Sequence, residues 1–190
     1  QLLMLRLKTG ERVLTLEDSL REMSSYDAST GLITYNTFRS FFATVMAGAR
    51  RHDSAGTVLF ASLANHNAIS EAHGNIAASK MMAEVARVTS ETIRTSDMLA
   101  KVEDDQFCLL LPQTASANLP IVLVNLNKHL AQASVRAGEV DLRPELDVSY
   151  VTYPLEKRTA DEVLALENRT SMGRLSEVAE AFAAEEGLEE

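Results

Sequence analysis

The chain has 190 residues, 46% of them hydrophobic, and carries a formal net charge of −9. This length accommodates one domain of ordinary size with a sizeable core. The acidic balance argues against nucleic acid as the main partner, because no basic run offsets phosphate charge. No apolar run reaches the roughly 18 residues that a membrane span requires. With one cysteine, Cys108, in an apolar run, we expect a cytoplasmic protein without disulfides or a membrane segment.

The first predicted element is a helix over residues 2–25. Hydrophobic residues repeat there at helical spacing, at Val13, Leu16, Leu20 and Met23. The spacing suits a two-helix seam that would form a homodimer or transmit a signal, and it equally suits one amphipathic helix packed on its own domain. The stretch LRLKTGERVLTLEDSLRE also resembles the end of the last helix of a response-regulator receiver. Because the chain starts at Gln1, we expect it to be part of a longer protein with receiver domains upstream.

Helical and strand patterns alternate after residue 25. They predict helices at Tyr35–Arg50, Glu71–Thr95, Ala115–Arg136 and Ala160–Ala184, and strands at Thr57–Leu63, Met98–Val102, Gln106–Leu111 and Leu146–Tyr153. The continuously apolar Phe107–Leu111 is expected to be a central strand, preceded by a tight hairpin turn. The alternation predicts an α/β (α+β) fold, with a linker helix at 1–25, a domain at 26–178 and an acidic tail at 179–190.

Three motifs occur in a fixed order along this domain. Asp27 to Leu32 reads D-A-S-T-G-L, Arg94 to Asp97 reads R-T-S-D, and E-D-D-Q-F follows after five more residues. These motifs resemble the D-x-L-T-G-L, R-x-x-D and G-G-[DE]-E-F patterns of GGDEF domains, the diguanylate cyclase family, and the likeness extends over about residues 26–175. The resemblance implies a nucleotide-cyclase-like fold, with a mostly antiparallel central sheet of about five strands flanked by helices.

The resemblance also locates the residues that a cyclase would use, and most of them differ in chemical type. The metal carboxylates fall on Ser62, Asp105 and Gln106, the glycine pair on Glu103 and Asp104, the guanine-reading residues on Ser70 and Ser79, and the phosphate lysines on Asn67 and Leu175. Magnesium needs several hard oxygen ligands, and only one carboxylate remains. We therefore expect no enzyme activity, no Mg²⁺ and no other cofactor. A new metal site built from the three acidic residues of the turn is the weaker alternative, because such a run is usually a solvated turn.

Arg94 and Asp97 keep the residue types of the R-x-x-D motif. In this family the motif is a site that binds cyclic di-GMP. An arginine fork can donate to guanine O6 and N7, and a carboxylate can accept from guanine N1 and N2. The plainer alternatives are a surface ion pair or a capped turn, worth about 0–1 kcal/mol.

A second cation would complete such a site. The position where family members often carry an arginine is Asn125 here. The cations that might replace it are Lys128, His129, and Arg50 or Arg51 of a second protomer.

Taken together, these features predict a catalytically inactive GGDEF domain. It would bind cyclic di-GMP and relay that binding to an unidentified partner protein in bacterial signalling. The receiver-like start is similar to receiver-receiver-GGDEF effectors, a resemblance that implies a cell-cycle role, regulated proteolysis and a place at the cell pole. The alternative is a dimerisation or adaptor module that binds no nucleotide.

Overall fold

The computed structural model describes residues 25–186 and builds them around a six-stranded sheet. The predicted helix over residues 2–25 lies outside this range, apart from its last residue. The strand order is β1-β3-β4-β2-β7-β8. These strands span Ile33–Thr34 (β1), Met98–Glu103 (β3), Gln106–Leu111 (β4), Gly56–Leu63 (β2), Leu146–Tyr153 (β7) and Thr170–Arg174 (β8). Only β1 pairs in parallel, with β3, so the predicted mostly antiparallel α+β fold is confirmed.

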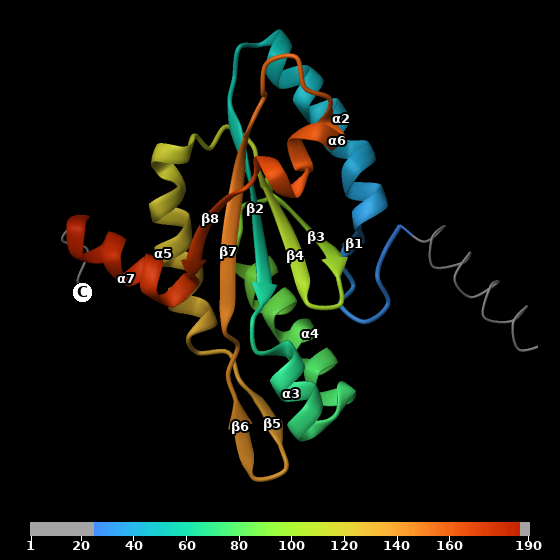
Figure 1. The fold of residues 1–190 in the computed structure, drawn as a ribbon, viewed down its shortest axis with the longest axis vertical. Coiled ribbons are helices and arrows are strands. Elements are labelled where there is room, and N and C mark those ends of the chain that lie inside the picture. The colour runs from blue at the N-terminus through green and yellow to red at the C-terminus, as the bar shows by residue number, and fades with distance from the viewer. Residues whose placement is uncertain (1–24, 187–190) are drawn as a thin grey trace, which may run out of the picture.

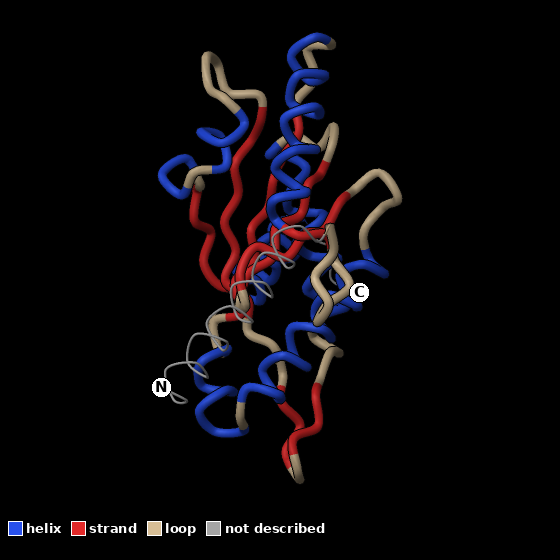
Figure 2. The backbone as a smooth tube through the Cα atoms, turned by 90° about the vertical axis from the view of Figure 1, so that its right-hand side faces the viewer, coloured by secondary structure: helices blue, strands red, loops and turns tan. Residues whose placement is uncertain are grey.

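Helices cover both faces of the sheet (Figure 1). Helices α2 (Tyr35–Arg51) and α6 (Ala160–Leu164) lie on one face. Helices α4 (Asn75–Thr92), α5 (Leu119–Leu130) and α7 (Leu175–Glu186) lie on the other. In Figure 2, turned by 90° so that the right-hand side of Figure 1 faces the viewer, helices lie across the strands and the sheet is seen from the side on which α2 packs. None of the helices within residues 25–186 is long and apolar enough to cross a membrane.

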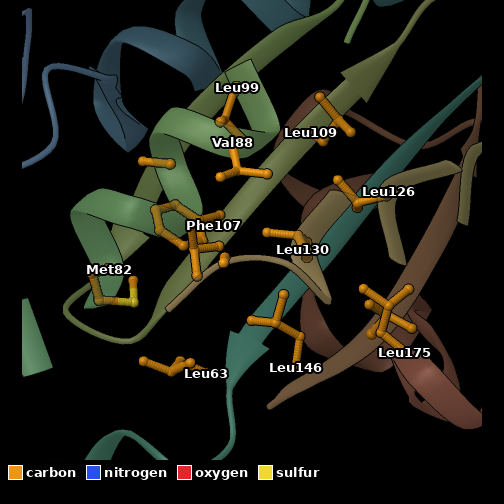
Figure 3. Close-up of a cluster of buried hydrophobic side chains, with 14 of the residues drawn as sticks. Leu63, Met82, Val88, Leu99, Phe107, Leu109, Leu126, Leu130, Leu146 and Leu175 are labelled. Carbon is orange, nitrogen blue, oxygen red and sulfur yellow. The ribbon is translucent and has the colours of Figure 1, made fainter. Parts of the chain in front are cut away.

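The central strands fill two cores because successive side chains point to opposite faces. In β4, Cys108 and Leu110 pack beneath α2, while Phe107 and Leu109 pack beneath α4 and α5. Figure 3 shows this second core, where Phe107 and Leu109 meet the side chains from the helices above. Strand β4 is therefore the central strand, covered on both faces, that its apolar run predicted.

Two predicted helices are shorter than expected. The helix predicted over Glu71–Thr95 is two helices, α3 (His66–His73) and α4, because Gly74 between them takes a φ of 86° that glycine adopts readily. The helix predicted over Ala115–Arg136 ends at Leu130. The next residues form a small hairpin of β5 (Val135–Ala137) and β6 (Val140–Leu142). This hairpin projects from the end of the molecule near α3 (Figure 1).

The prediction of a single helix over Ala160–Ala184 is wrong. A capping box formed by Thr159 and Glu162 begins the short helix α6. Strand β8 and helix α7 then follow. Because β8 pairs with β7, hydrogen bonding to an existing strand overrides the helical pattern. The added strand gives the sheet six strands rather than about five.

Candidate functional site

Arg94 and Asp97 lie at the two ends of one tight turn between α4 and β3. The Arg94 amide donates to Asp97 Oδ2 at 2.9 Å, and the Asp97 amide donates to the Arg94 carbonyl at 3.0 Å. Ser96 Oγ donates to Asp97 Oδ1 at 3.3 Å. The Asp97 carboxylate is thus held in a defined orientation, and each of its oxygens can still accept a further hydrogen bond.

The Arg94 side chain is exposed. Within residues 25–186 its guanidinium makes no hydrogen bond and no ion pair, including with Asp97. The carboxylate therefore caps the turn through the backbone and leaves the cation unengaged. All five N–H donors of the guanidinium can address a ligand without giving up a protein partner.

The structure separates the candidate second cations into two groups. Arg50 donates to the carbonyls of Leu155, at 3.1 Å, and Arg158, so its fork already holds a loop in place. Arg51, next in the chain, is exposed, and so is Lys128 on α5. Arg50 is exposed too, but within residues 25–186 the side chains of Arg51 and Lys128 make no hydrogen bond or ion pair that they would have to give up to a ligand.

The α5 position that lacks arginine offers no charge. The Asn125 side chain is exposed, and the backbone carbonyl oxygen of Asn125 lies 2.8 Å from His129 Nδ1. The imidazole is therefore occupied within its own helix. Helices α4 and α5 pack on the same face of the sheet.

The hairpin between β3 and β4 turns through Asp104 and Asp105. Glu103 pairs with Gln106, with a register shift between Lys101 and Glu103. Among residues 25–186, positive φ in a residue other than glycine occurs only at Asp53, Gln113 and Lys157. The turn is therefore built without the left-handed backbone that glycine would supply. Its tip is acidic and open, since the Asp104 side chain is 95% exposed.

Ser62 and Gln106, the positions that the resemblance assigns to two metal carboxylates, face each other across β2 and β4. Gln106 Nε2 donates to Ser62 Oγ at 2.7 Å. Both side chains are neutral, and within the described part of the chain no three His, Cys, Asp or Glu residues gather to hold a metal ion. The Mg²⁺ that the resemblance implies does not fit this donor set, because it needs hard anionic oxygens.

A small cavity of about 240 Å³ lies beside the hairpin. It is lined by residues that include Ser79, Lys101 and Asp104. Lys101 Nζ lies 3.1 Å from Ser29 Oγ and 3.6 Å from both Asp27 Oδ2 and Asp104 Oδ1.

The Asp27 carboxylate stays charged beside this lysine. Burial raises the pKa of the Asp27 carboxyl, but hydrogen bonds from Ser29 and Thr30 and the charge of Lys101 outweigh it, so the pKa lies below its ordinary value. Lys101 is therefore engaged by two carboxylates at the mouth of the cavity.

Three other positions that the resemblance assigns to nucleotide contacts either contact a neighbouring side chain or lie in another part of the fold. Ser70 Oγ donates to Asn75 Oδ1, and Asn67 Oδ1 lies 3.5 Å from the His66 ring. Leu175 is buried and lines a different cavity, between α5 and α7. The structure thus does not bring Leu175 to the hairpin, where a phosphate lysine would be required.

Two polar residues that sequence reasoning missed are Lys101 and Arg169. Lys101 was predicted only as part of a strand. Arg169 lay inside the segment wrongly predicted as one helix, yet its guanidinium reaches Gln106 Oε1 at 3.4 Å. Only the pairing of β8 with β7 brings this arginine back to the hairpin.

Comparison with known proteins shows which family and fold the domain resembles. The family described as "Diguanylate cyclase, GGDEF domain" matches residues 24–171. The cyclic di-GMP phosphodiesterase NbdA of Pseudomonas aeruginosa is 25% identical over 146 residues, which cover 77% of this chain but only 18% of NbdA.

Two solved structures have the same fold. The GGDEF domain of DgcB from Caulobacter crescentus, in complex with c-di-GMP, has a TM-score of 0.68 at 12% identity, covering 74% of this chain and 84% of its own. The diguanylate cyclase SiaD of Pseudomonas aeruginosa, in complex with its activator SiaC, also has a TM-score of 0.68, at 20% identity, covering 93% of this chain and 65% of its own. At these identities the likeness is one of fold.

Proposed function

Because this chain belongs to the GGDEF domain family of bacterial cyclic di-GMP signalling, we propose that it is a receptor that binds cyclic di-GMP at the Arg94–Asp97 turn and does not synthesise it. The observation that carries the proposal is the contrast between the two residues. Asp97 is oriented by a 2.9 Å backbone hydrogen bond, while the exposed Arg94 guanidinium has no partner within residues 25–186. The Asp97 acceptor is therefore already oriented for a ligand, and the Arg94 donors give up no protein hydrogen bond to meet it.

The chemistry of guanine suits this pair. The Asp97 carboxylate can accept from guanine N1 and N2, and the Arg94 fork can donate to O6 and N7 of the same or a stacked base. Cyclic di-GMP carries two guanines and two phosphates, so Arg51 of a second protomer or Lys128 would supply the remaining positive charge. DgcB was solved with c-di-GMP bound, which supports this ligand class for the fold.

The proposed lack of synthesis follows from the electrostatics of the hairpin. Phosphoryl transfer from GTP depends on metal ions that neutralise and position the phosphates. Ser62 and Gln106 hydrogen-bond to each other instead of presenting carboxylates. The tip carries Glu103, Asp104 and Asp105, which repel a triphosphate at short range.

Binding would be relayed through protein contacts. We propose a homodimer in which ligand bridges two protomers, joined through the N-terminal segment to receiver domains, as in receiver-receiver-GGDEF effectors at the cell pole. SiaD is bound to an activator protein, which supports protein partnership as a mode for this fold. The neutral Asn125 favours the alternative, an adaptor without nucleotide binding.

Isothermal titration calorimetry with Arg94→Ala tests the receptor function. Loss of a bidentate guanine contact should weaken cyclic di-GMP binding by about 1–3 kcal/mol, which is roughly fivefold to 150-fold in affinity. Arg136→Ala is the matched control, because Arg136 is exposed but paired with Asp141 on the distant β5–β6 hairpin. Absence of binding heat in the wild-type chain would leave the adaptor function as the better description, and an isotherm unchanged by Arg94→Ala would contradict binding at the Arg94–Asp97 turn.

A turnover assay tests the absence of synthesis. We expect no cyclic di-GMP from GTP with Mg²⁺ or Mn²⁺, either in the wild-type chain or in Asp105→Ala. Product that appears in the wild type and disappears in Asp105→Ala would show that the remaining acidic residue supports catalysis.

A further inference from the structure

The side chain of Arg169 brings a positive charge to the two positions that the family assigns to metal carboxylates. Arg169 directly precedes β8, and its guanidinium is fixed on three sides. Nε and Nη2 donate to the Leu164 carbonyl at 3.1 and 2.9 Å, and Nη1 donates to Gln106 Oε1 at 3.4 Å. The guanidinium carbon lies 3.4 Å from the centre of the Phe60 ring, close enough for a cation-π contact.

These contacts link the cation to both neutral residues. Gln106 accepts from Arg169 through Oε1 and donates to Ser62 Oγ through Nε2. Phe60 and Ser62 are two residues apart on β2, so their side chains lie on the same face of the sheet. Two consecutive hydrogen bonds thus link Arg169 to Ser62 through Gln106, on the face of β2 and β4 that α2 covers.

Arg169 is half-buried, and its neighbours offset only part of the effect of burial on its charged form. Burial lowers the pKa of the Arg169 guanidinium, while Tyr35, Cys108 and the carboxylate of Glu103 act in the opposite direction. Arginine stays protonated in proteins.

We infer that Arg169 is a tethered cation that takes the place of the divalent metal, so that restoring carboxylates at residues 62 and 106 would not by itself restore a metal site. A carboxylate introduced at residue 106 would meet a guanidinium already positioned to form a charge-assisted hydrogen bond with it, and a carboxylate at residue 62 would lie next to that pair. A metal ion would have to compete for these carboxylates with a cation that is covalently part of the chain. It would also be repelled by the nearby guanidinium charge.

Metal exclusion by Arg169 rests on the assignment of Ser62 and Gln106 as carboxylate positions and not on cyclic di-GMP binding. Metal exclusion by Arg169 and binding of cyclic di-GMP are therefore tested separately. A chain that failed to bind cyclic di-GMP could still exclude metal in this way, and a receptor could bind cyclic di-GMP whatever Arg169 does.

Mn²⁺ binding, followed by electron paramagnetic resonance of the free ion, tests the role of Arg169. Three variants are compared: S62D/Q106E, S62D/Q106E/R169Q and S62D/Q106E/R136Q. Removing Arg169 should tighten Mn²⁺ binding by at least about tenfold relative to the double variant, while removing Arg136, which lies on the β5–β6 hairpin, should change nothing. Equal affinity in S62D/Q106E and S62D/Q106E/R169Q would overturn the inference, as would a triple variant that binds no better than wild type.

Thermal unfolding provides the second readout, which does not require the triple variant to fold. The melting temperature of S62D/Q106E should not rise with millimolar Mn²⁺, because its carboxylates are already paired with Arg169. A Mn²⁺-dependent rise in that double variant would contradict a tethered cation at this position.

Discussion

Replacing Tyr153 by phenylalanine probes a buried polar atom at the end of the sheet. The Tyr153 side chain is 2% exposed, at the end of β7. Its ring packs edge-on against Phe42, with centroids 5.0 Å apart. Its hydroxyl is buried, and within residues 25–186 it has no hydrogen-bond partner. Tyr153→Phe keeps the ring and removes only this hydroxyl.

The expected gain follows from the cost of burying an unpaired polar group. That cost is about 1–3 kcal/mol. Because the phenylalanine ring keeps the contact with Phe42, we expect Tyr153→Phe to raise the free energy of unfolding by about 1 kcal/mol at neutral pH.

The pH dependence of the unfolding free energy gives a second signal. Burial and then the charge of Asp97 raise the pKa of Tyr153 to about 12, from an ordinary value of 10.0. The folded state therefore holds the phenol proton more tightly than the unfolded state. The resulting stability is fully present below about pH 10 and is lost as pH rises towards about 12. Tyr153→Phe has no proton to lose there.

Urea unfolding followed by circular dichroism, at neutral pH and across the alkaline range, measures both effects. The difference between variant and wild type should widen as pH rises above about 10. Tyr150→Phe is the matched control, since Tyr150 lies on the opposite face of the same strand. A loss of about 1 kcal/mol or more in Tyr153→Phe at neutral pH would show that the hydroxyl is hydrogen-bonded, and would refute the reasoning.

Two further substitutions test the packing and the helix start that position the site. In Gly56→Ala, the added Cβ would overlap the Tyr153 ring, 2.8 Å from Cε1, so we expect a loss of about 1–3 kcal/mol in urea unfolding; full retention of stability would contradict this packing. Thr159→Ala removes the capping box of α6 and should cost about 1 kcal/mol, with Thr95→Ala in an exposed turn as control; equal losses in the two would argue against the cap.

The sequence predicted the parts of the fold that local patterns determine. Strands β4 and β7 begin and end where alternation and apolar runs placed them, at Gln106–Leu111 and Leu146–Tyr153. Strand β8 was not predicted because it forms by pairing with β7. The paired residues Asp147 and Arg174 are 27 positions apart in the sequence. A helical pattern gives no information about such distant pairing.

For the site as well, local motifs could be predicted from the sequence and contacts between distant residues could not. The Arg94–Asp97 motif was visible because its residues are adjacent in sequence and its spacing to the hairpin is fixed. The hydrogen bonds from Arg50 to the carbonyls of Leu155 and Arg158 could not be predicted from the sequence. Nor could the contact of Arg169 with Gln106. Both depend on loops brought together only by the completed sheet.

A paired calorimetric titration with cyclic di-GMP and cyclic di-AMP tests most directly whether Arg94 and Asp97 read guanine. The two ligands share the sugar-phosphate ring, but adenine lacks the O6 acceptor and the N1 and N2 donors that this turn would recognise. We expect saturable heat with cyclic di-GMP and none with cyclic di-AMP at tens of micromolar. Absence of heat with both ligands, or equal affinity for both, would contradict a guanine-reading receptor site.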